Sequence, residues 1–244
     1  MKIIISRTEQ DLGKNAAKYV AAILNECIEK KGSARIVLST GASQLSTFEA
    51  LVHEKVDWSK VTMFHLDEYV NLPETHIASF RKYLKERFID KIGSKRMNYI
   101  TGEGDTAKTI AEITAAIREK PIDIGVIGIG ENGHIAFNDP PADFETTEAY
   151  HVVKLDEKCR MQQVGEGWFA TIDDVPAYAI SATVHQLFSC KSVVSVVPHK
   201  VKAKAVYDTL KSPEVTNLVP ATKLREHADW YLYLDEESAA LLEK

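Results

Sequence analysis

A glycine-rich run around one histidine is the segment of this sequence best suited to proton transfer. It reads Gly128-Ile129-Gly130-Glu131-Asn132-Gly133-His134-Ile135-Ala136-Phe137-Asn138-Asp139-Pro140-Pro141. Its glycines permit tight backbone turns, and histidine is the side chain most often used for proton transfer. Asn132 and Asp139 can each supply an oxygen that fixes the tautomer of the ring. A metal site is the rival chemistry, but no second His or Cys lies at ligand spacing in the run.

A second candidate is the pair of adjacent carboxylates Asp67 and Glu68, directly after the apolar run Val61–Phe64. A carboxylate at the end of a strand can act as a general base, with its neighbour orienting or tuning it. The alternative is a solvated acidic turn, which is the commoner role of a lone Asp-Glu pair. The residues alone do not show which of the two carboxylates would enter a site.

The third candidate is a loop of small and hydroxyl residues that follows the apolar run Ile36–Leu38 and precedes a helical pattern. It reads Ser39-Thr40-Gly41-Ala42-Ser43-Gln44. Small residues let backbone N–H groups approach a ligand, and the start of a helix favours an anion, so the loop predicts a phosphate cradle. An ordinary N-cap explains the Ser and Thr residues equally well. The loop is neither a Walker A nor a GxGxxG motif, so nucleotide binding gains no support.

These loops need a scaffold of strands and helices. Short apolar runs rich in β-branched residues predict buried strands, which we expect to be covered on both faces, at Ile3–Ile5, Ile36–Leu38, Val61–His65, Ile122–Ile127, Val193–Val197 and Trp230–Leu234. Helical patterns lie at residues 8–30, 106–118 and 200–211, and Asp235 is placed to cap a final helix. The alternation predicts one doubly wound α/β domain over residues 1–244, with a mainly parallel, Rossmann-like sheet. Ligands then bind beyond the carboxyl ends of the strands.

Composition narrows the classes of partner. The 35 acidic and 30 basic residues give a net charge of −5, which disfavours a nucleic-acid-binding protein. Three cysteines without a CxxC motif do not form a disulfide framework. There is no signal-peptide pattern and no apolar run of the ~18 residues that cross a membrane. We therefore expect a cytoplasmic protein that binds neither membranes nor nucleic acid.

Two segments, LDEYVNLPETHIASF and GIGENGHIAFNDPP, together resemble the glucosamine-6-phosphate deaminase (isomerase) family. The family's usual forms are DEYxGLP…S[YF] and GxGxxGHIxFNEP, and STGAS here corresponds to its phosphate loop TGGT. The order and spacing match over essentially the whole chain. The resemblance implies a Rossmann-like parallel α/β fold and no cofactor or metal. It also implies conversion of a 2-amino-2-deoxyhexose 6-phosphate to a ketohexose 6-phosphate and ammonium.

The resemblance further implies roles for individual residues. Asp67 would be the base that moves a proton from C2 to C1, and His134 would assist opening of the pyranose ring. Asn132 and Asp139 would orient the imidazole. The residues expected to bind the substrate and its phosphate are Thr40, Gly41, Ala42, Ser43, Gly130, Gly133 and Lys202.

The chain departs from the family pattern at several positions. Asp139 replaces a Glu, Asn132 stands where some members have Asp, and Ala42 replaces a Gly, which requires a negative φ or some strain. A phosphate-binding arginine in a stretch like NSRFF is absent, because residues 162–169 read QQVGEGWF. Either Arg160 or another donor substitutes for it, or the substrate differs.

Alternative functions remain open. 6-Phosphogluconolactonase has a related motif, but the residues after Gly-His-x-Ala are FNDP here and not SLFP. Galactosamine 6-phosphate is an alternative substrate, and a non-catalytic sugar-phosphate sensor would need neither Asp67 nor His134. The segment 157–163 has few cations and the chain lacks the extended tail of allosteric members. We expect a monomer or small homo-oligomer with hyperbolic kinetics.

Overall fold

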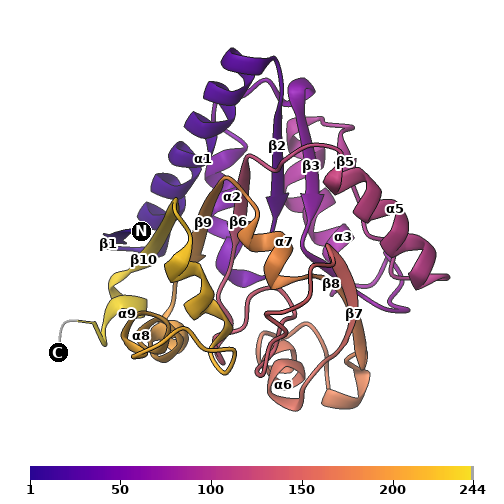
Figure 1. Cartoon of the computed structure of the whole chain (residues 1–244), viewed down its shortest axis with the longest axis vertical. Coiled ribbons are helices and arrows are strands. Elements are labelled where there is room, and N and C mark those ends of the chain that lie inside the picture. The colour runs from indigo at the N-terminus through magenta and orange to yellow at the C-terminus, as the bar shows by residue number, and fades with distance from the viewer. Residues whose placement is uncertain (243–244) are drawn as a thin grey trace.

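The predicted strands all belong to one seven-stranded sheet in the computed structural model, which describes residues 1–242 (Figure 1). Every neighbouring pair in this sheet is parallel. In spatial order the strands are β1 (Lys2–Ser6), β10 (Trp230–Asp235), β9 (Ser192–Val197), β6 (Ile124–Ile127), β2 (Ala34–Leu38), β3 (Val61–His65) and β5 (Met97–Asn98). The predicted mainly parallel α/β fold is confirmed.

The strand order reverses between β2 and β6. From β2 the chain adds β3 and then β5 on one side, whereas β6, β9 and β10 follow each other on the other side. At such a point the loops that leave the two strands diverge and open a crevice at the carboxyl edge of the sheet. The loop Ser39–Gln44 follows β2, and the loop that begins at Gly128 follows β6. The topology thus brings two of the candidate segments to one place.

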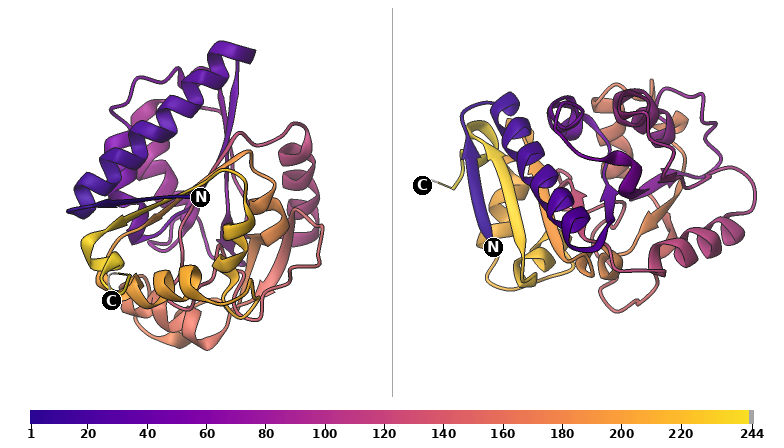
Figure 2. Two further views of the ribbon diagram at one scale, coloured as in Figure 1. Left: turned by 60° about the vertical axis from the view of Figure 1, so that its left-hand side comes forward. Right: turned by 90° about the horizontal axis from the view of Figure 1, so that it is seen from above.

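Helices cover both faces of the sheet, and the left view of Figure 2 shows α1 and α5 on opposite sides of the strands. The α-helices are α1 (Glu9–Lys31), α2 (Leu45–Leu51), α3 (Phe80–Leu84), α4 (Asp90–Ile92), α5 (Thr106–Arg118), α6 (Glu157–Gly165), α7 (Val184–Phe188), α8 (Ala203–Lys211) and α9 (Glu236–Ala239). A π-helical turn spans Lys85–Ile89, and 3-10 turns span Ala42–Gln44, Trp58–Lys60, Ile172–Asp174, Lys200–Lys202 and Pro220–Glu226. Within residues 1–242, no helix is long and apolar enough to cross a membrane.

The helix α1 shows why the sequence pattern identifies this scaffold. The Thr8 hydroxyl accepts a hydrogen bond from the Asp11 N–H, which caps the first turn. The apolar stripe that includes Leu12 and Leu24 is fully buried against the sheet. Gly32 ends the helix in the left-handed conformation with φ 78°, which glycine adopts without a steric penalty. The capping residues and the apolar stripe therefore predict the same helix that the structure shows.

A second, three-stranded antiparallel sheet was not predicted. It consists of β4 (Asp67–Tyr69), β8 (Tyr178–Ala182) and β7 (Tyr150–Lys154), in that order. Only Leu66 separates the end of β3 from the start of β4. The chain therefore passes from one sheet directly into the other at Asp67.

Two details of the sequence prediction are wrong. Ile3 and Ile5 are 41% and 46% exposed, because β1 is an edge strand whose outer face has little cover, so it is not buried on both faces. The segment 200–211 is not one regular helix, since the 3-10 turn Lys200–Lys202 precedes α8. Asp235 does cap α9, accepting a hydrogen bond of 2.7 Å from the Ser238 N–H.

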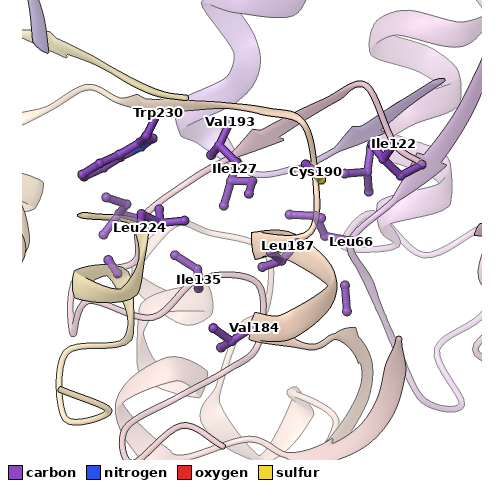
Figure 3. Close-up of a cluster of buried hydrophobic side chains, with 14 of the residues drawn as sticks. Leu66, Ile122, Ile127, Ile135, Val184, Leu187, Cys190, Val193, Leu224 and Trp230 are labelled. Atoms are coloured by element: carbon purple, nitrogen blue, oxygen red, sulfur yellow. The ribbon is translucent and has the colours of Figure 1, made fainter. Parts of the chain in front are cut away.

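Two of the buried side chains in the core flank candidate functional residues. Figure 3 shows Leu66 and Ile135 within a cluster that also contains Leu187 and Trp230. Leu66 precedes Asp67 and Ile135 follows His134, and both are almost completely buried. Burying such a side chain stabilises the fold by about 1.5–3 kcal/mol. The core thus holds the backbone on which both candidate residues sit.

Candidate active site

A pocket opens at the reversal point between β2 and β6. The lining residues come from the loops after these strands, from the junction of β3 and β4, and from α3, α6 and the turn after β9. They are Ser39, Thr40, Gly41, Ala42, Ser43, Gln44, Leu66, Asp67, Phe80, Gly128, Ile129, Gly130, His134, Ala136, Phe137, Gln162, Gln163, Glu166 and Lys202.

The loop after β2 presents its backbone to this pocket. Gly41 has φ 96°, and the 3-10 turn Ala42–Gln44 follows and leads into α2. Ala42 is outside the positive-φ region, so its methyl group is accommodated without strain. In the described residues, no backbone acceptor takes the N–H groups of residues 40–43. The Tyr83 hydroxyl donates a 2.8 Å hydrogen bond to the Gly41 carbonyl and ties the loop to α3.

Lys202 supplies a cation at the same pocket from the 3-10 turn after β9. The residue is only 4% exposed, and no acidic group in the described residues forms an ion pair with it. Burial lowers the pKa of the Lys202 ammonium, and the negative charges of Glu166 and Glu131 partly oppose this shift. A buried cation beside free backbone N–H groups suits a bound anion, whose charge would stabilise the protonated amine.

Of the adjacent carboxylates Asp67 and Glu68, Asp67 is the one that lines the pocket. It is 7% exposed, and its side chain accepts no hydrogen bond from the described residues. Burial raises the pKa of Asp67 to about 8, with a further contribution from the negative charge of Glu68. A carboxyl group whose pKa lies near neutrality can both accept and return a proton at physiological pH.

Glu68 points away from the pocket and organises the chain around it. Its carboxylate accepts hydrogen bonds from the Tyr69 N–H at 3.0 Å and from the Ser79 hydroxyl at 3.0 Å. It also accepts from the N–H groups of Phe80 and Arg81, and from the Arg81 guanidinium at 3.1 Å. This fully buried network joins β4 to the start of α3. The adjacent carboxylates therefore divide into one that faces the pocket and one that holds the structure.

His134 faces the pocket with its Nδ1 already engaged. This nitrogen lies 2.6 Å from Asn132 Oδ1 and 3.1 Å from Asp139 Oδ1, and the Asn132 amide donates to the same carboxylate at 3.2 Å. Two acceptors at Nδ1 place the proton there and leave Nε2 as a proton acceptor. Burial alone would raise the pKa of Asp139, but the hydrogen bonds from His134 and Asn132 outweigh it and hold that pKa below its ordinary value.

Glycine is required beside this ring. A Cβ on Gly130 would lie 2.1–2.4 Å from atoms of the His134 imidazole, so any side chain at position 130 would displace the ring. Gly133 has φ 83°, and a Cβ there would lie 2.8 Å from Val219 Cγ1. The glycines therefore set the shape of the loop in which His134 lies.

The sequence model of the family described as "Glucosamine-6-phosphate isomerases/6-phosphogluconolactonase" matches residues 7–232. The chain belongs to this family. A curated member from Exiguobacterium sibiricum, named glucosamine-6-phosphate deaminase, is 36% identical over 208 residues, which are 85% of this chain and 81% of the relative. A Streptococcus pneumoniae member of the same name is 32% identical over 245 residues and covers 100% of both chains.

Solved structures of family members agree with the fold. A monomeric glucosamine-6-phosphate deaminase superposes with a TM-score of 0.91 at 30% identity, covering 99% of this chain and 100% of its own. A 6-phosphogluconolactonase from Thermotoga maritima superposes with a TM-score of 0.79 at 16% identity, covering 96% and 99%. The second likeness shows a shared fold alone.

The structure does not bring Arg160, one of the substitutes considered for the family's arginine, into the pocket. Its guanidinium donates to the backbone carbonyls of Ile172 at 2.5 Å and Val175 at 3.1 Å, and Arg160 is not among the pocket residues. Gln162 on α6 and Glu166 directly after it face the pocket, and Arg160 lies two positions before Gln162, on a different face of the helix. Gly133 also lies outside the pocket lining and acts through the shape of its loop.

Several lining residues were not identified from the sequence. Gln163 lies on α6 and Glu166 directly follows it, and Phe80 and Phe137 supply aromatic walls. The Glu166 carboxylate accepts hydrogen bonds from Gln162 at 2.7 Å and from the Trp168 indole at 3.0 Å. Their place in the sequence could have identified Gln163 and Glu166, because the stretch that lacks the family's arginine also forms this wall of the pocket.

Proposed function

We propose that this chain converts glucosamine 6-phosphate to fructose 6-phosphate and ammonium without a cofactor. The observation that carries the proposal is the convergence of three groups on one pocket: the carboxylate of Asp67, the oriented imidazole of His134, and an anion-binding end that contains Lys202. Relatives at 36% and 32% identity that carry the name glucosamine-6-phosphate deaminase support the same reaction.

The phosphate would lie against the loop of residues 40–43, close to Lys202 and Gly130. The free N–H groups of the loop and the buried ammonium are donors for the phosphate oxygens. We propose that they replace the arginine that other family members use to bind the phosphate. Binding the phosphate at this end supplies energy that positions C1 and C2 of the sugar at the other end. Gln163 is an additional neutral donor at this wall.

His134 would first accept the proton of the sugar's O1 hydroxyl at Nε2 and then donate it to the ring oxygen O5 as the C1–O5 bond breaks, which opens the pyranose ring. The imidazolium that forms is stabilised by Asp139, whose carboxylate lies 3.1 Å from Nδ1, and Asn132 keeps the ring oriented. The shorter Asp139 therefore still reaches the imidazole in place of the family's Glu.

Asp67 would next take the proton from C2 and return it at C1. This transfer converts the C1 aldehyde to a hydroxymethyl group and leaves a C=N bond at C2. Water then adds to this imine and gives the carbinolamine from which ammonium leaves. A 2-ammonium group close to Asp67 favours the ionised carboxylate and offsets the effect of burial on its pKa.

We also propose that residues 1–244 act as one unit in the cytoplasm, as a monomer or small homo-oligomer. The monomeric relative supports the low oligomeric state. The net charge of −5 argues against a nucleic-acid partner, and a small sugar phosphate is the proposed ligand.

A panel of substrates tests the reaction. Purified protein is incubated separately with glucosamine 6-phosphate, galactosamine 6-phosphate and 6-phosphogluconolactone, while ammonium, ketose phosphate and acid release are measured. We expect stoichiometric ammonium and fructose 6-phosphate from the first compound. Preference for galactosamine 6-phosphate would change the assigned epimer, acid release from the lactone alone would favour the hydrolase, and binding without turnover would favour a sensor.

A further inference from the structure

A cysteine lies beside the groups that orient His134. Cys159 Sγ, a ring nitrogen of His134 and a carboxylate oxygen of Asp139 all lie within 4.8 Å of one another, and His134 Nδ1 is 3.1 Å from Asp139 Oδ1. Cys159 belongs to α6 and is almost completely buried, whereas the other two residues belong to the loop after β6. Within residues 1–242, no other group of three His, Cys or acidic side chains brings its ligand atoms this close.

The position of the Cys159 thiol is fixed, and one carboxylate oxygen of Asp139 has no hydrogen-bond donor among the described residues. Asp156 caps α6 and its carboxylate accepts a 2.6 Å hydrogen bond from the Cys159 N–H, which anchors Cys159 in the first turn. Asp139 Oδ2 is buried and accepts no hydrogen bond from the described residues, and the Asp139 side chain is only 9% exposed. The proposed reaction has no use for the thiol.

We propose that His134, Asp139 and Cys159 form a binding site for Zn²⁺ that switches the enzyme off. Imidazole nitrogen, carboxylate oxygen and thiolate sulfur are the donors that zinc takes in proteins, with bonds of about 2.0–2.3 Å. A tetrahedral ion with such bonds separates its ligand atoms by about 3.4–3.7 Å. Movements of about 1 Å bring these donors to that spacing, and water or the Asn132 amide oxygen completes the coordination.

The loss of activity follows from proton positions, and this part rests on the proposed function. Zinc bonds to the lone pair of Nδ1, so the proton now on Nδ1 moves to Nε2. The thiol S–H proton passes to solvent as the Zn–S bond forms, and Asp139 binds as the carboxylate it already is. Nε2 then carries a hydrogen and cannot accept the proton of the sugar hydroxyl. Zinc would therefore block ring opening while leaving the phosphate end intact.

Cobalt spectroscopy on the tag-free, full-length protein tests the site without reference to activity. Co²⁺ takes the same ligands as zinc with lower affinity, and a cobalt–thiolate bond absorbs in the near ultraviolet. We expect this band to appear on titration, to be removed by one equivalent of Zn²⁺, and to be absent in Cys159→Ser. Asp139→Asn should weaken binding as well, whereas Cys190→Ser, which alters a buried cysteine outside the cluster, should retain the band.

Inhibition of ammonium release gives the second measurement. Relative to its own zinc-free rate, Cys159→Ser should require at least ~10-fold more Zn²⁺ for half-inhibition, and Cys190→Ser should behave as the unmodified protein. A wild-type cobalt spectrum without a thiolate band, or one that Cys159→Ser leaves unchanged, would overturn the site. If the protein released no ammonium from any substrate, the proposed function would fail while the cobalt spectra still decided the metal site.

Discussion

At the scale of single residues, the burial of Asp67 sets the pH dependence of the reaction. Its pKa is raised to about 8, and only the ionised carboxylate can take the proton from C2. We expect kcat/KM to rise with pH up to a limb near 8, because this ratio reports groups of the free enzyme. Initial rates at low substrate concentration between pH 5 and pH 9 measure it, and a limb near 4 would contradict the shift.

Replacing the base separates catalysis from binding. Asp67→Asn should lower kcat by ~10²–10⁴, the usual contribution of a general base, and should change KM much less because the phosphate contacts remain. Ammonium release near the unmodified rate would remove Asp67 from the mechanism.

The stability of the same variant is the control against misfolding. The folded protein holds a proton on Asp67 that the unfolded chain releases above about pH 4, so the carboxylate costs stability progressively as pH rises toward 8. Above pH 8, Asp67→Asn should therefore have a free energy of unfolding higher than that of the unmodified protein by on the order of 1 kcal/mol or more, and should unfold at a higher temperature. Both differences should vanish below pH 4.

His134 is expected to act on a different step from Asp67. His134→Gln should slow turnover of the closed pyranose, because the glutamine amide can accept a hydrogen bond from the sugar hydroxyl but cannot take up its proton. Exchange of the C1 proton of fructose 6-phosphate with solvent, in the presence of ammonium, isolates the proton transfer between carbons. Abolition of this exchange in His134→Gln, to the extent seen in Asp67→Asn, would show that ring opening is not its sole role.

At the scale of elements, α3 directly contacts the loop of residues 40–43, which we propose binds the phosphate. Tyr83→Phe removes the 2.8 Å hydrogen bond to the Gly41 carbonyl without opening a large cavity. Such a bond contributes about 0.5–1.5 kcal/mol, so KM for glucosamine 6-phosphate should rise ~2–10-fold with kcat nearly unchanged. Tyr207→Phe, on the exposed side of α8, is the matched control and should leave both constants unaltered. An equal fall in kcat would place Tyr83 in the chemistry rather than in binding.

The elements also show what the sequence can predict. Six strands of the parallel sheet and the helix α1 were predictable, because continuous β-branched runs and a capped apolar stripe encode burial locally. The two-residue strand β5 was not predicted, because it is too short to show such a pattern. The small sheet was not, because β4 has only three residues and β7 alternates between buried and exposed positions in a loop-like stretch. The convergence of Asp67, His134 and Lys202 followed from topology and resemblance together.

Contacts that depend on helix phase lay beyond the sequence. Nothing in residues 157–167 indicates that Arg160 turns toward backbone carbonyls while Glu166 turns toward the pocket. Likewise, the proximity of Cys159 to Asp139 arises from how α6 packs over the loop, and no spacing in the sequence encodes it.

At the scale of the whole molecule, we expect no cooperativity. Regulation by an effector requires a second site and two states that the effector distinguishes. The segment 157–163 has only two cations, and the guanidinium of one of them, Arg160, is occupied by backbone carbonyls. Velocity should be hyperbolic in glucosamine 6-phosphate and unaffected by N-acetylglucosamine 6-phosphate. A Hill coefficient clearly above 1 that this compound shifts would reveal a regulatory site elsewhere.

The end of β8 joins the segments that carry Asp67 and His134. The Ala182 N–H donates to the Leu66 carbonyl at 2.7 Å, the Ser181 hydroxyl accepts from the Phe137 N–H at 3.0 Å, and the Asn138 amide donates to the Ala182 carbonyl at 2.8 Å. Through these bonds β8 fixes the distance between the backbone next to Asp67 and the backbone next to His134. The separation of Asp67 and His134 is therefore set by backbone hydrogen bonds. Surface mutations should leave this separation unchanged, whereas unfolding of the small sheet should abolish it.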